Sequence, residues 1–311
     1  MKKNVLITGG AGFIGTNLRI ELESRGHQVF IADLLNENKE SYYRCDVSNY
    51  RHLEKVFSEC PNFDFVYHLA AEYGRWNGEA HYENLWSTNV IGTKNILRLQ
   101  ERYGFKLIFF SSAEVYGDYS GEMIEELMFS APINETYQMN DYAISKWAGE
   151  LMCMNAAKMH GAEIVRTRPV NCYGPHEEYN EYRGFIPKFI YQALHNEPIT
   201  VFAGHKRIID FVGDSVKTWA NISDNFIPGE VYNVGSRQEW ELEITEVANI
   251  VLAETGASSN LLQIMDKEPH TTDIKTISSA KAIRDLSHNP TVSPREGIKE
   301  TVDWMKWYYR L

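Results

Sequence analysis

Short apolar runs alternate with amphipathic stretches through roughly the first 170 residues of the chain. The apolar runs predict buried strands, and apolar residues at helical spacing between them predict helices. Strands alternating with helices indicate βαβ units, and therefore an α/β fold with a doubly wound parallel sheet. The predicted strands are residues 5–8, 28–32, 42–47, 63–71, 106–110 and 163–168, and the predicted helices are residues 13–25, 50–59, 85–101 and 141–159.

The regular alternation ends after about residue 172. An amphipathic helix over 184–196, a short strand over 199–202 and a closing helix over 294–309 are predicted there. We therefore expect two domains: residues 1–171 form the sheet domain, and residues 172–311 mostly form a smaller mixed α/β domain that binds the substrate. Segments near 208–235 are expected to return to the main sheet.

Three glycines spaced three apart break the pattern between the first strand and the first helix. Gly9, Gly12 and Gly15 permit positive φ and let a ligand approach the bare backbone. The helix that begins there directs unpaired N–H groups and its positive dipole end into the turn. A dinucleotide pyrophosphate is the usual anion at such a strand–turn–helix unit, and Phe13 and Ile14 lie in the same turn.

Asp33 ends the second predicted strand, about 20 residues beyond the glycine turn. A carboxylate at this distance binds the adenosine ribose hydroxyls of a dinucleotide. The residues that follow, Leu34, Leu35 and Asn36, offer no arginine for a 2′-phosphate. The sequence therefore favours NAD over NADP.

Other candidate cofactor contacts follow the later strands, because ligands lie across the carboxyl ends of a parallel sheet. Asp46 is a candidate for hydrogen bonds to the adenine edge, and small residues after the fourth strand allow close cofactor packing. The cofactor candidates in these segments are Asp46, Val47, Leu69, Ala70, Ala71 and Asn89.

A tyrosine and a lysine open the helix that begins at Asp141. Tyr142 and Lys146 are four residues apart and so share one helix face. A tyrosine titrates near pH ~10, but a neighbouring ammonium favours the phenolate, so we expect Lys146, together with the positive nicotinamide ring, to lower the pKa of Tyr142. Tyr142 could then take a proton from a substrate hydroxyl while Ser112, at the tip of the fifth strand, orients the same oxygen. Both residues of the helix are also expected to contact the cofactor.

Composition limits the partners of the chain. The 311 residues carry a net charge of −11 without a basic cluster, which argues against nucleic acid. The N-terminus leads directly into the first strand, and no apolar run is long enough to span a bilayer, so we expect a cytoplasmic protein without membrane association. The four cysteines are scattered, and no metal site is predicted.

Taken together, these motifs resemble the extended short-chain dehydrogenases, and more narrowly the NAD-dependent nucleotide-sugar epimerase/dehydratase family. The resemblance implies bound NAD, a Rossmann domain, a C-terminal domain for a nucleotide-diphosphate sugar, and a homodimer. It also implies oxidation of the sugar at C4 to a transient ketone, usually followed by return of the hydride. The motifs are residues 8–15, Asp33, residues 68–71, residues 112–117, Tyr142 with Lys146, and residues 171–175.

The resemblance leaves three outcomes open: epimerisation, which we favour slightly, 4,6-dehydration of the dTDP-glucose or GDP-mannose type, and decarboxylation of UDP-glucuronate. Glu114 lies two residues beyond Ser112 and would share its face if the strand continued, so it is the fourth candidate catalytic residue. Dehydratases of the family usually carry Asp-Glu where this chain has Ala113-Glu114. A non-catalytic NAD(H)-binding regulator is the alternative of another class, but it would not need the tyrosine base.

The candidate substrate contacts are less regular. Members of the family commonly place an arginine before the Asp-Phe pair, where this chain has Ile209. Arg207 and Lys206 are therefore the candidates for the diphosphate, with Lys267 as a further one. The remaining candidates for substrate binding are Glu72, Ser112, Asn171 and Lys188.

Overall fold

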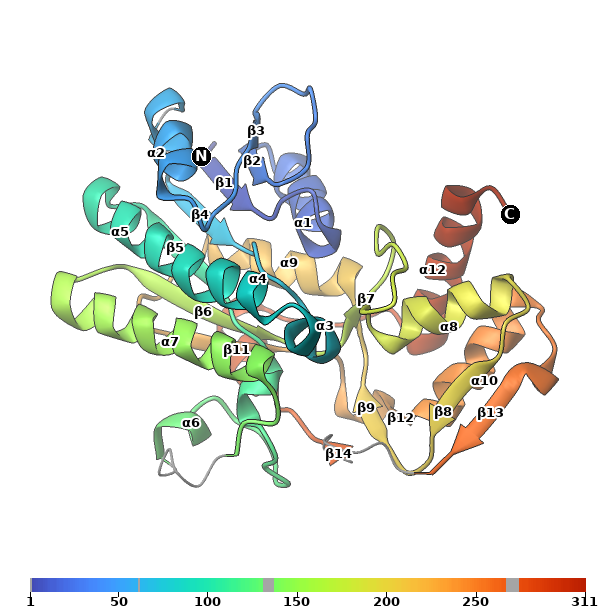
Figure 1. Ribbon diagram of the computed structural model, residues 1–311. Helices are drawn as coiled ribbons and strands as arrows, with labels where there is room; N and C mark the ends of the chain where they lie inside the picture. The colour runs from blue at the N-terminus through green and yellow to red at the C-terminus, as the bar shows by residue number, and fades with distance from the viewer. Residues whose placement is uncertain (1, 61, 131–136, 267–273) are drawn as a thin grey trace.

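The computed structural model describes residues 2–60, 62–130, 137–266 and 274–311. Its centre is a seven-stranded sheet in the order β3-β2-β1-β4-β5-β6-β11, and every pairing in it is parallel (Figure 1). This confirms the predicted doubly wound sheet. The strands are β1 (Asn4–Thr8), β2 (Gln28–Asp33), β3 (Tyr42–Arg44), β4 (Phe65–His68), β5 (Lys106–Phe110), β6 (Ile164–Pro169) and β11 (Val231–Val234).

Helices cover both faces of the sheet because alternate strand residues point to opposite sides. Val5 and Ile7 of β1 pack toward the helices of one face, whereas Leu6 packs toward those of the other. Each face therefore has its own apolar core. The helices of the first face are α1 (Phe13–Ser24), α9 (Val212–Ile222) and α11 (Ala280–Leu286), and those of the second are α2 (Tyr50–Glu59), α5 (Thr93–Tyr103) and α7 (Asp141–His160).

Helix α7 forms where the sequence predicts it, because both of its ends are capped. The Asn140 side chain accepts a hydrogen bond from the Ala143 amide at 2.9 Å, and Gly161 ends the helix in the left-handed conformation. The result is a 20-residue helix whose first turn carries Tyr142 and Lys146 at the carboxyl edge of the sheet.

The segment between β4 and α5 is more broken than predicted. Instead of one helix over 85–101, the chain forms α3 (Arg75–Ala80), α4 (Tyr82–Trp86) and a π-helical turn over Ser87–Gly92 that continues into α5. Such π-helical turns occur often at functional sites. Here the turn lies between the sheet and the loops that follow the carboxyl ends of its strands.

The C-terminal lobe has a separate apolar core. Its closing helix begins with a capping box between Ser293 and Glu296, with Pro294 in the first turn, and its bounds match the prediction. The elements around this core are α8 (Phe185–Leu194), α10 (Ile244–Thr255), α12 (Pro294–Tyr309), β8 (Ile199–Phe202) and β13 (Leu262–Met265).

Short strands connect the lobe to the main sheet (Figure 1). The chain leaves the sheet after β6 and returns to it at β11, which pairs with β6. The connecting strands are β7 (Cys172–Tyr173), β10 (Asp210–Phe211), β9 (Lys206–Ile208), β12 (Glu241–Glu243) and β14 (Ile274–Lys275), and the short helix α6 (Leu127–Ser130) lies before α7. Within the part of the chain that is described, no helix combines the length and apolar composition that crossing a membrane requires.

Candidate active site

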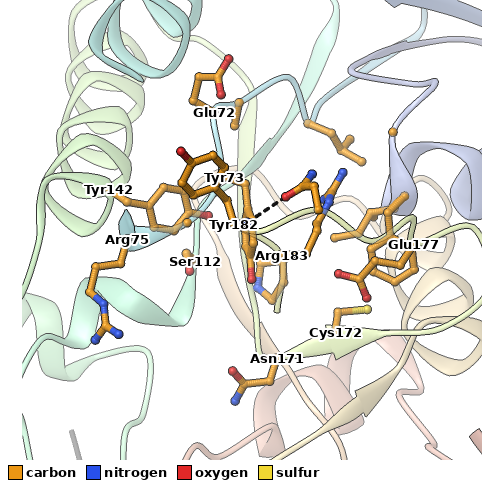
Figure 2. A pocket seen from close by; sticks show the side chains of 18 of the residues that line it. Glu72, Tyr73, Arg75, Ser112, Tyr142, Asn171, Cys172, Glu177, Tyr182 and Arg183 are labelled. Atoms are coloured by element: carbon orange, nitrogen blue, oxygen red, sulfur yellow. Dashed lines mark hydrogen bonds between the residues drawn. The ribbon is translucent and has the colours of Figure 1, made fainter. Parts of the chain in front are cut away.

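A cavity of about 860 Å³ runs along the carboxyl ends of the strands and continues under the C-terminal lobe. The glycine turn lies at one end, the residues after β4 and β5 lie in the middle, and residues of β9, β14 and α8 close the other end. Figure 2 shows side chains from the sheet domain and from the C-terminal lobe facing the same space. The cavity can therefore hold a cofactor and a substrate in contact with each other.

The three glycines of the turn have different physical roles. Gly9 has a φ of 71°, and a Cβ there would lie 2.7 Å from the Ala70 amide nitrogen. A Cβ at Gly15 would overlap the Gly9 carbonyl. At Gly12 the nearest atom would be 3.3 Å away, and φ is −74°, so the chain itself does not demand a glycine at this position. Gly12 lines the cavity, which leaves its open side for a ligand.

The helix after the turn fits an anion. Gly12 is the N-cap residue of α1, and no side chain caps the helix there. Its first amide groups are thus directed toward the cavity end where Gly12, Phe13 and Ile14 lie. The residues present match the requirements of a dinucleotide pyrophosphate.

Asp33 lines the same end of the cavity and also stabilises the turn. Its Oδ2 accepts a hydrogen bond from the Ala11 amide at 3.0 Å, and its Oδ1 accepts one from the Leu35 amide at 3.3 Å. Asp46 and Val47 line the cavity next to it, although the third strand ends earlier than predicted, at Arg44. Asp46 Oδ1 accepts hydrogen bonds from the Ser48 amide and hydroxyl, so its carboxylate also starts the turn into α2.

The residues after β4 also face the cavity, with one exception. Leu69, Ala70 and Ala71 line it, whereas Asn89 does not. Asn89 is buried in the π-helical turn, where it accepts a hydrogen bond from the Glu72 amide and donates to Ser145 Oγ. The structure therefore places Asn89 behind the cavity wall, where it supports the wall through hydrogen bonds.

Ser112, Tyr142 and Lys146 meet in the middle of the cavity. The Lys146 ammonium lies 5.9 Å from the centre of the Tyr142 ring and donates a hydrogen bond of 2.9 Å to the Phe110 carbonyl. The Ser112 hydroxyl accepts a hydrogen bond from the Glu114 amide at 3.2 Å, which starts a 3₁₀ helix over Ala113–Tyr116. The three candidate catalytic groups are thus held by backbone contacts at the ends of β5 and α7.

Lys146 by itself does not lower the pKa of Tyr142 below its ordinary value. Burial raises the pKa of Tyr142, Tyr73 adds to this, and the Ser112 hydroxyl opposes it. Burial also lowers the pKa of Lys146 to about 8. The ammonium donates its hydrogen bond to the Phe110 carbonyl, and Lys146 is not among the groups that lower the pKa of Tyr142.

Glu114 lines the cavity, but the reason we predicted for this is wrong. The strand does not continue past Phe110, and the 3₁₀ helix that Ser112 caps carries Glu114 toward the cavity instead. The Lys275 ammonium donates a hydrogen bond of 2.5 Å to Glu114 Oε1. Burial by itself would raise the pKa of Glu114, but Lys275, and then Arg207 and Arg75, lower it. Glu114 is therefore a carboxylate at neutral pH.

The candidate substrate residues lie toward the other end of the cavity. Arg207 of β9 and Lys188 of α8 line it, whereas Lys206 and Ile209 do not. Asn171 lines the cavity and donates a hydrogen bond to the Ile208 carbonyl at 3.0 Å. Lys267 lies outside the described residues.

Glu72 lines the cavity as predicted from its place after β4. Its carboxylate accepts a hydrogen bond of 2.9 Å from the Asn77 side chain, so it also anchors the segment that leads into α3.

Sequence reasoning missed several residues that face the cavity. Lys275 pairs beside Arg207 in the parallel register of β14 and β9, which no local pattern indicates. Glu177 follows His176, a non-glycine residue with a φ of 70°, in the loop before α8. Positive φ at such a residue marks a conformation that its surroundings impose. The missed cavity residues used below are Glu177 and Lys275, whereas the sequence predicts that the insert over residues 73–78 shapes the sugar pocket and that Arg183 is a candidate substrate contact.

Comparisons with known proteins cover nearly the whole chain. The model of the NAD dependent epimerase/dehydratase family matches residues 5–235. The chain is 32% identical to the UDP-N-acetyl-alpha-D-glucosaminuronate decarboxylase of Bacillus cytotoxicus, over 98% of both sequences.

Solved structures show the same similarity. An epimerase of Methanothermobacter thermautotrophicus has a TM-score of 0.90 at 28% identity and covers 99% of this chain and 94% of its own. The UDP-glucose 4-epimerase of Thermus thermophilus, solved with NAD, has a TM-score of 0.81 at 27% identity and covers 97% and 99%. The similarity therefore includes both the glycine turn and the C-terminal lobe.

Two glycine substitutions should separate ligand binding from folding. Gly12→Ala should change the free energy of unfolding by less than ~0.5 kcal/mol, because neither its φ nor its neighbours exclude a Cβ. It should weaken binding of NAD⁺ at least about tenfold, or about 1.4 kcal/mol. Gly9→Ala should instead cost roughly 1 kcal/mol or more of stability because of its positive φ. Calorimetric titration with NAD⁺ and urea unfolding measure both quantities. Unchanged NAD⁺ affinity in Gly12→Ala would contradict the assignment of this end of the cavity.

Removing Lys275 should raise the pKa of Glu114. The Lys275 ammonium favours the carboxylate, so Lys275→Met should move the titration of Glu114 to higher pH, and Lys275→Arg should keep it low. The carboxyl carbon signal of ¹³C-labelled glutamate, assigned with Glu114→Gln, measures this directly. Lys299→Met, which removes an exposed lysine of α12, is the control. An unshifted Glu114 titration in Lys275→Met would show that the ion pair does not set its charge.

Proposed function

The chain belongs to the NAD dependent epimerase/dehydratase family, and from this membership we propose that it oxidises C4 of a nucleotide-diphosphate sugar to a transient ketone. The hydride returns after the sugar has changed, and epimerisation is the outcome that we favour. The enzyme is thus an internal redox catalyst that uses NAD without consuming it.

One observation carries this proposal: Ser112, Tyr142 and Lys146 line the same cavity as the glycine turn and Asp33. A non-catalytic NAD(H)-binding regulator would need only the turn and the carboxylate. Two features support binding of NAD at the glycine turn. The side of Gly12 that faces the cavity leaves space for a ligand, and no side chain caps the first turn of α1. NAD⁺ supplies the hydride acceptor when it is bound, and the residues that would hold it are Gly9, Gly12, Gly15, Asp33 and Lys146.

The proton chemistry falls to Tyr142 and its neighbours. Ser112 Oγ would bind the C4 hydroxyl and orient it, while Tyr142 would accept the proton of that hydroxyl. Burial raises the pKa of Tyr142 and Lys146 by itself does not offset this, so formation of the phenolate would need the positive nicotinamide ring of bound NAD⁺ in addition to the Lys146 ammonium. Return of the proton from Tyr142 would complete the cycle.

Arg207 and Lys188 are proposed to bind the diphosphate. They come from β9 and α8, at the end of the cavity opposite the glycine turn. This arrangement would direct the sugar inward to Tyr142. The guanidinium of Arg207 can bind phosphate oxygens through two hydrogen bonds, whereas Lys188 contributes a point charge.

Glu114 argues against dehydration. Loss of the C6 hydroxyl as water requires a proton donor, but Lys275 keeps Glu114 ionised and Ala113 has no acidic group. A carboxylate can instead accept a proton from carbon next to the ketone. Epimerisation needs such a base when the change occurs beside C4.

Decarboxylation is the second candidate, and one specific observation favours it. The relative at 32% identity is named a decarboxylase of a UDP-linked uronate, and the similarity extends over 98% of both chains. A sugar carboxylate could lie near Lys275, which pairs with Glu114 in the cavity. The loss of CO₂ distinguishes this outcome from epimerisation.

The first test removes the proposed base. Tyr142→Phe should still bind NAD⁺ but lower turnover by about a hundredfold or more, because the hydroxyl proton then has no acceptor. Met159→Gln, a substitution at the exposed end of the same helix, is the control. Turnover that survives in Tyr142→Phe would remove the catalytic assignment.

The second test identifies the reaction. Incubation with UDP-, GDP-, dTDP- and CDP-sugars should give products whose masses equal those of the substrates if epimerisation is correct. NMR spectra of the products would then show which centre has inverted. A mass loss corresponding to water or to CO₂ would replace epimerisation with dehydration or decarboxylation.

We also propose that two copies associate through the outer faces of α5 and α7. These helices contact each other, and Ile144, Leu151 and Met154 of α7 expose apolar side chains on one face. Ile91, just before α5, and Tyr103, at its end, are exposed in the same layer. Sedimentation analysis should give a dimer for the native chain and a monomer for Leu151→Glu/Met154→Glu. A native monomer would contradict this association.

A further inference from the structure

Two carboxyl groups in the cavity are held in opposite protonation states. Lys275 keeps Glu114 ionised, as described above. Glu177 is 3% exposed, and burial raises its pKa to about 8 although Arg183 opposes this. At neutral pH one group is therefore a base and the other is an acid. Titratable pairs whose environments separate their pKa values in this way are the usual marks of an acid and base assignment.

The position and contacts of Glu177 are a second observation, separate from the raised pKa of its carboxyl group. Glu177 lines the cavity, and its Oε2 is buried without a hydrogen-bond partner among the described residues. A buried carboxyl oxygen is seldom left unpaired, so its presence at a cavity wall indicates a ligand partner. The left-handed conformation of His176, directly before it, fixes the direction of the loop at this point.

Tyr73 lies near Glu177 and packs against Tyr142. Its ring packs edge-on against Tyr142 with centres 5.7 Å apart. The position that a Cβ would take at Gly184 is 3.8 Å from the Tyr73 hydroxyl and 4.0 Å from Glu177 Oε1, so both oxygens face one small space. The phenol can thus pass a proton from Glu177 toward the centre of the cavity.

We propose that Glu114 and Glu177, with Tyr73 as relay, form an acid–base pair that inverts the sugar carbon next to the C4 ketone. This rests on the proposed function, because only the ketone makes that carbon's hydrogen acidic. It extends that function by making the enzyme an epimerase at C3 or C5, with hydride transfer at C4 as the enabling step.

The proposed step balances without any further reactant. The Glu114 carboxylate takes the proton from carbon, and the C–H electron pair moves into an enolate with the C4 oxygen. The carboxylic acid of Glu177 then gives its proton, across the Tyr73 hydroxyl, to the opposite side of that carbon, and the ketone forms again. No electrons leave the sugar, and the two carboxyl groups afterwards exchange protons with water.

Exchange with deuterated water tests the pair. In D₂O the native enzyme should place one deuterium on C3 or C5 of the product, detected by NMR and mass spectrometry. Glu177→Gln keeps the size of the side chain but cannot donate the carboxyl proton, and Tyr73→Phe removes the relay. Both should reduce deuterium in the inverted product by about a hundredfold, because Glu114 alone can return deuterium only to the side from which it took the proton. In Glu177→Gln, formation of NADH in a single turnover should change by less than about twofold, because Tyr142 and Lys146 are untouched. In Tyr73→Phe, deuterium incorporation is compared with that variant's own rate of NADH formation, because Tyr73 packs against Tyr142.

The control is Glu178→Gln, which removes the neighbouring exposed carboxylate and should leave deuterium incorporation unchanged. Glu177→Asp keeps the carboxyl group on a shorter side chain and should recover part of the deuterium incorporation. Such recovery would show that the loss in Glu177→Gln is not caused by misfolding. Undiminished deuterium in Glu177→Gln, or none in the native product, would overturn the acid–base pair while leaving C4 oxidation intact. If the native enzyme forms no NADH with any sugar in the panel, the proposed function itself fails.

Discussion

The buried pair of Glu150 and Arg168 holds the catalytic elements in register. Both side chains are fully buried, and two hydrogen bonds of 2.8 Å join the guanidinium to the carboxylate. Glu150 lies on α7 two turns beyond Tyr142, Arg168 lies on β6, and Ser111 of the β5 tip donates to the same carboxylate at 2.6 Å. Loss of one partner from such a pair typically costs about 3–5 kcal/mol because an uncompensated charge remains. The helix with the base and the strand tip with Ser112 are therefore joined through one buried charge.

The same network reaches the loops around the cavity. Arg168 also donates to the Tyr116 hydroxyl, and that hydroxyl donates to Asn233 of β11. Asn233 in turn donates from its amide to the Glu125 carboxylate. These bonds connect the 3₁₀ helix that carries Glu114 to the strand where the chain re-enters the sheet. Positions that are distant in sequence thus share one rigid polar core.

The cations beside each carboxyl group determine whether that group is ionised. Glu114, Glu150 and Glu177 are all buried to some degree, yet their protonation differs because their neighbours differ. Arg168 keeps Glu150 ionised for a structural purpose, and Lys275 does the same for Glu114 at the cavity wall. Arg183 alone does not overcome the burial of Glu177. The chemistry of each group is set by which cation the fold brings beside it.

Local sequence patterns determined the sheet, the glycine turn, Asp33 and the helix that carries Tyr142 and Lys146. Each depends on contacts between residues close in the chain, such as the Asn140 cap of α7 or the apolar period of β1. The partner of Glu114, the raised pKa of Glu177 and the place of Asn89 behind the cavity wall depended on tertiary structure. Lys275 is 161 residues from Glu114 and reaches it only because β14 pairs with β9. The raised pKa of Tyr142 had the same origin, since burial is a property of the packed molecule and not of a four-residue spacing.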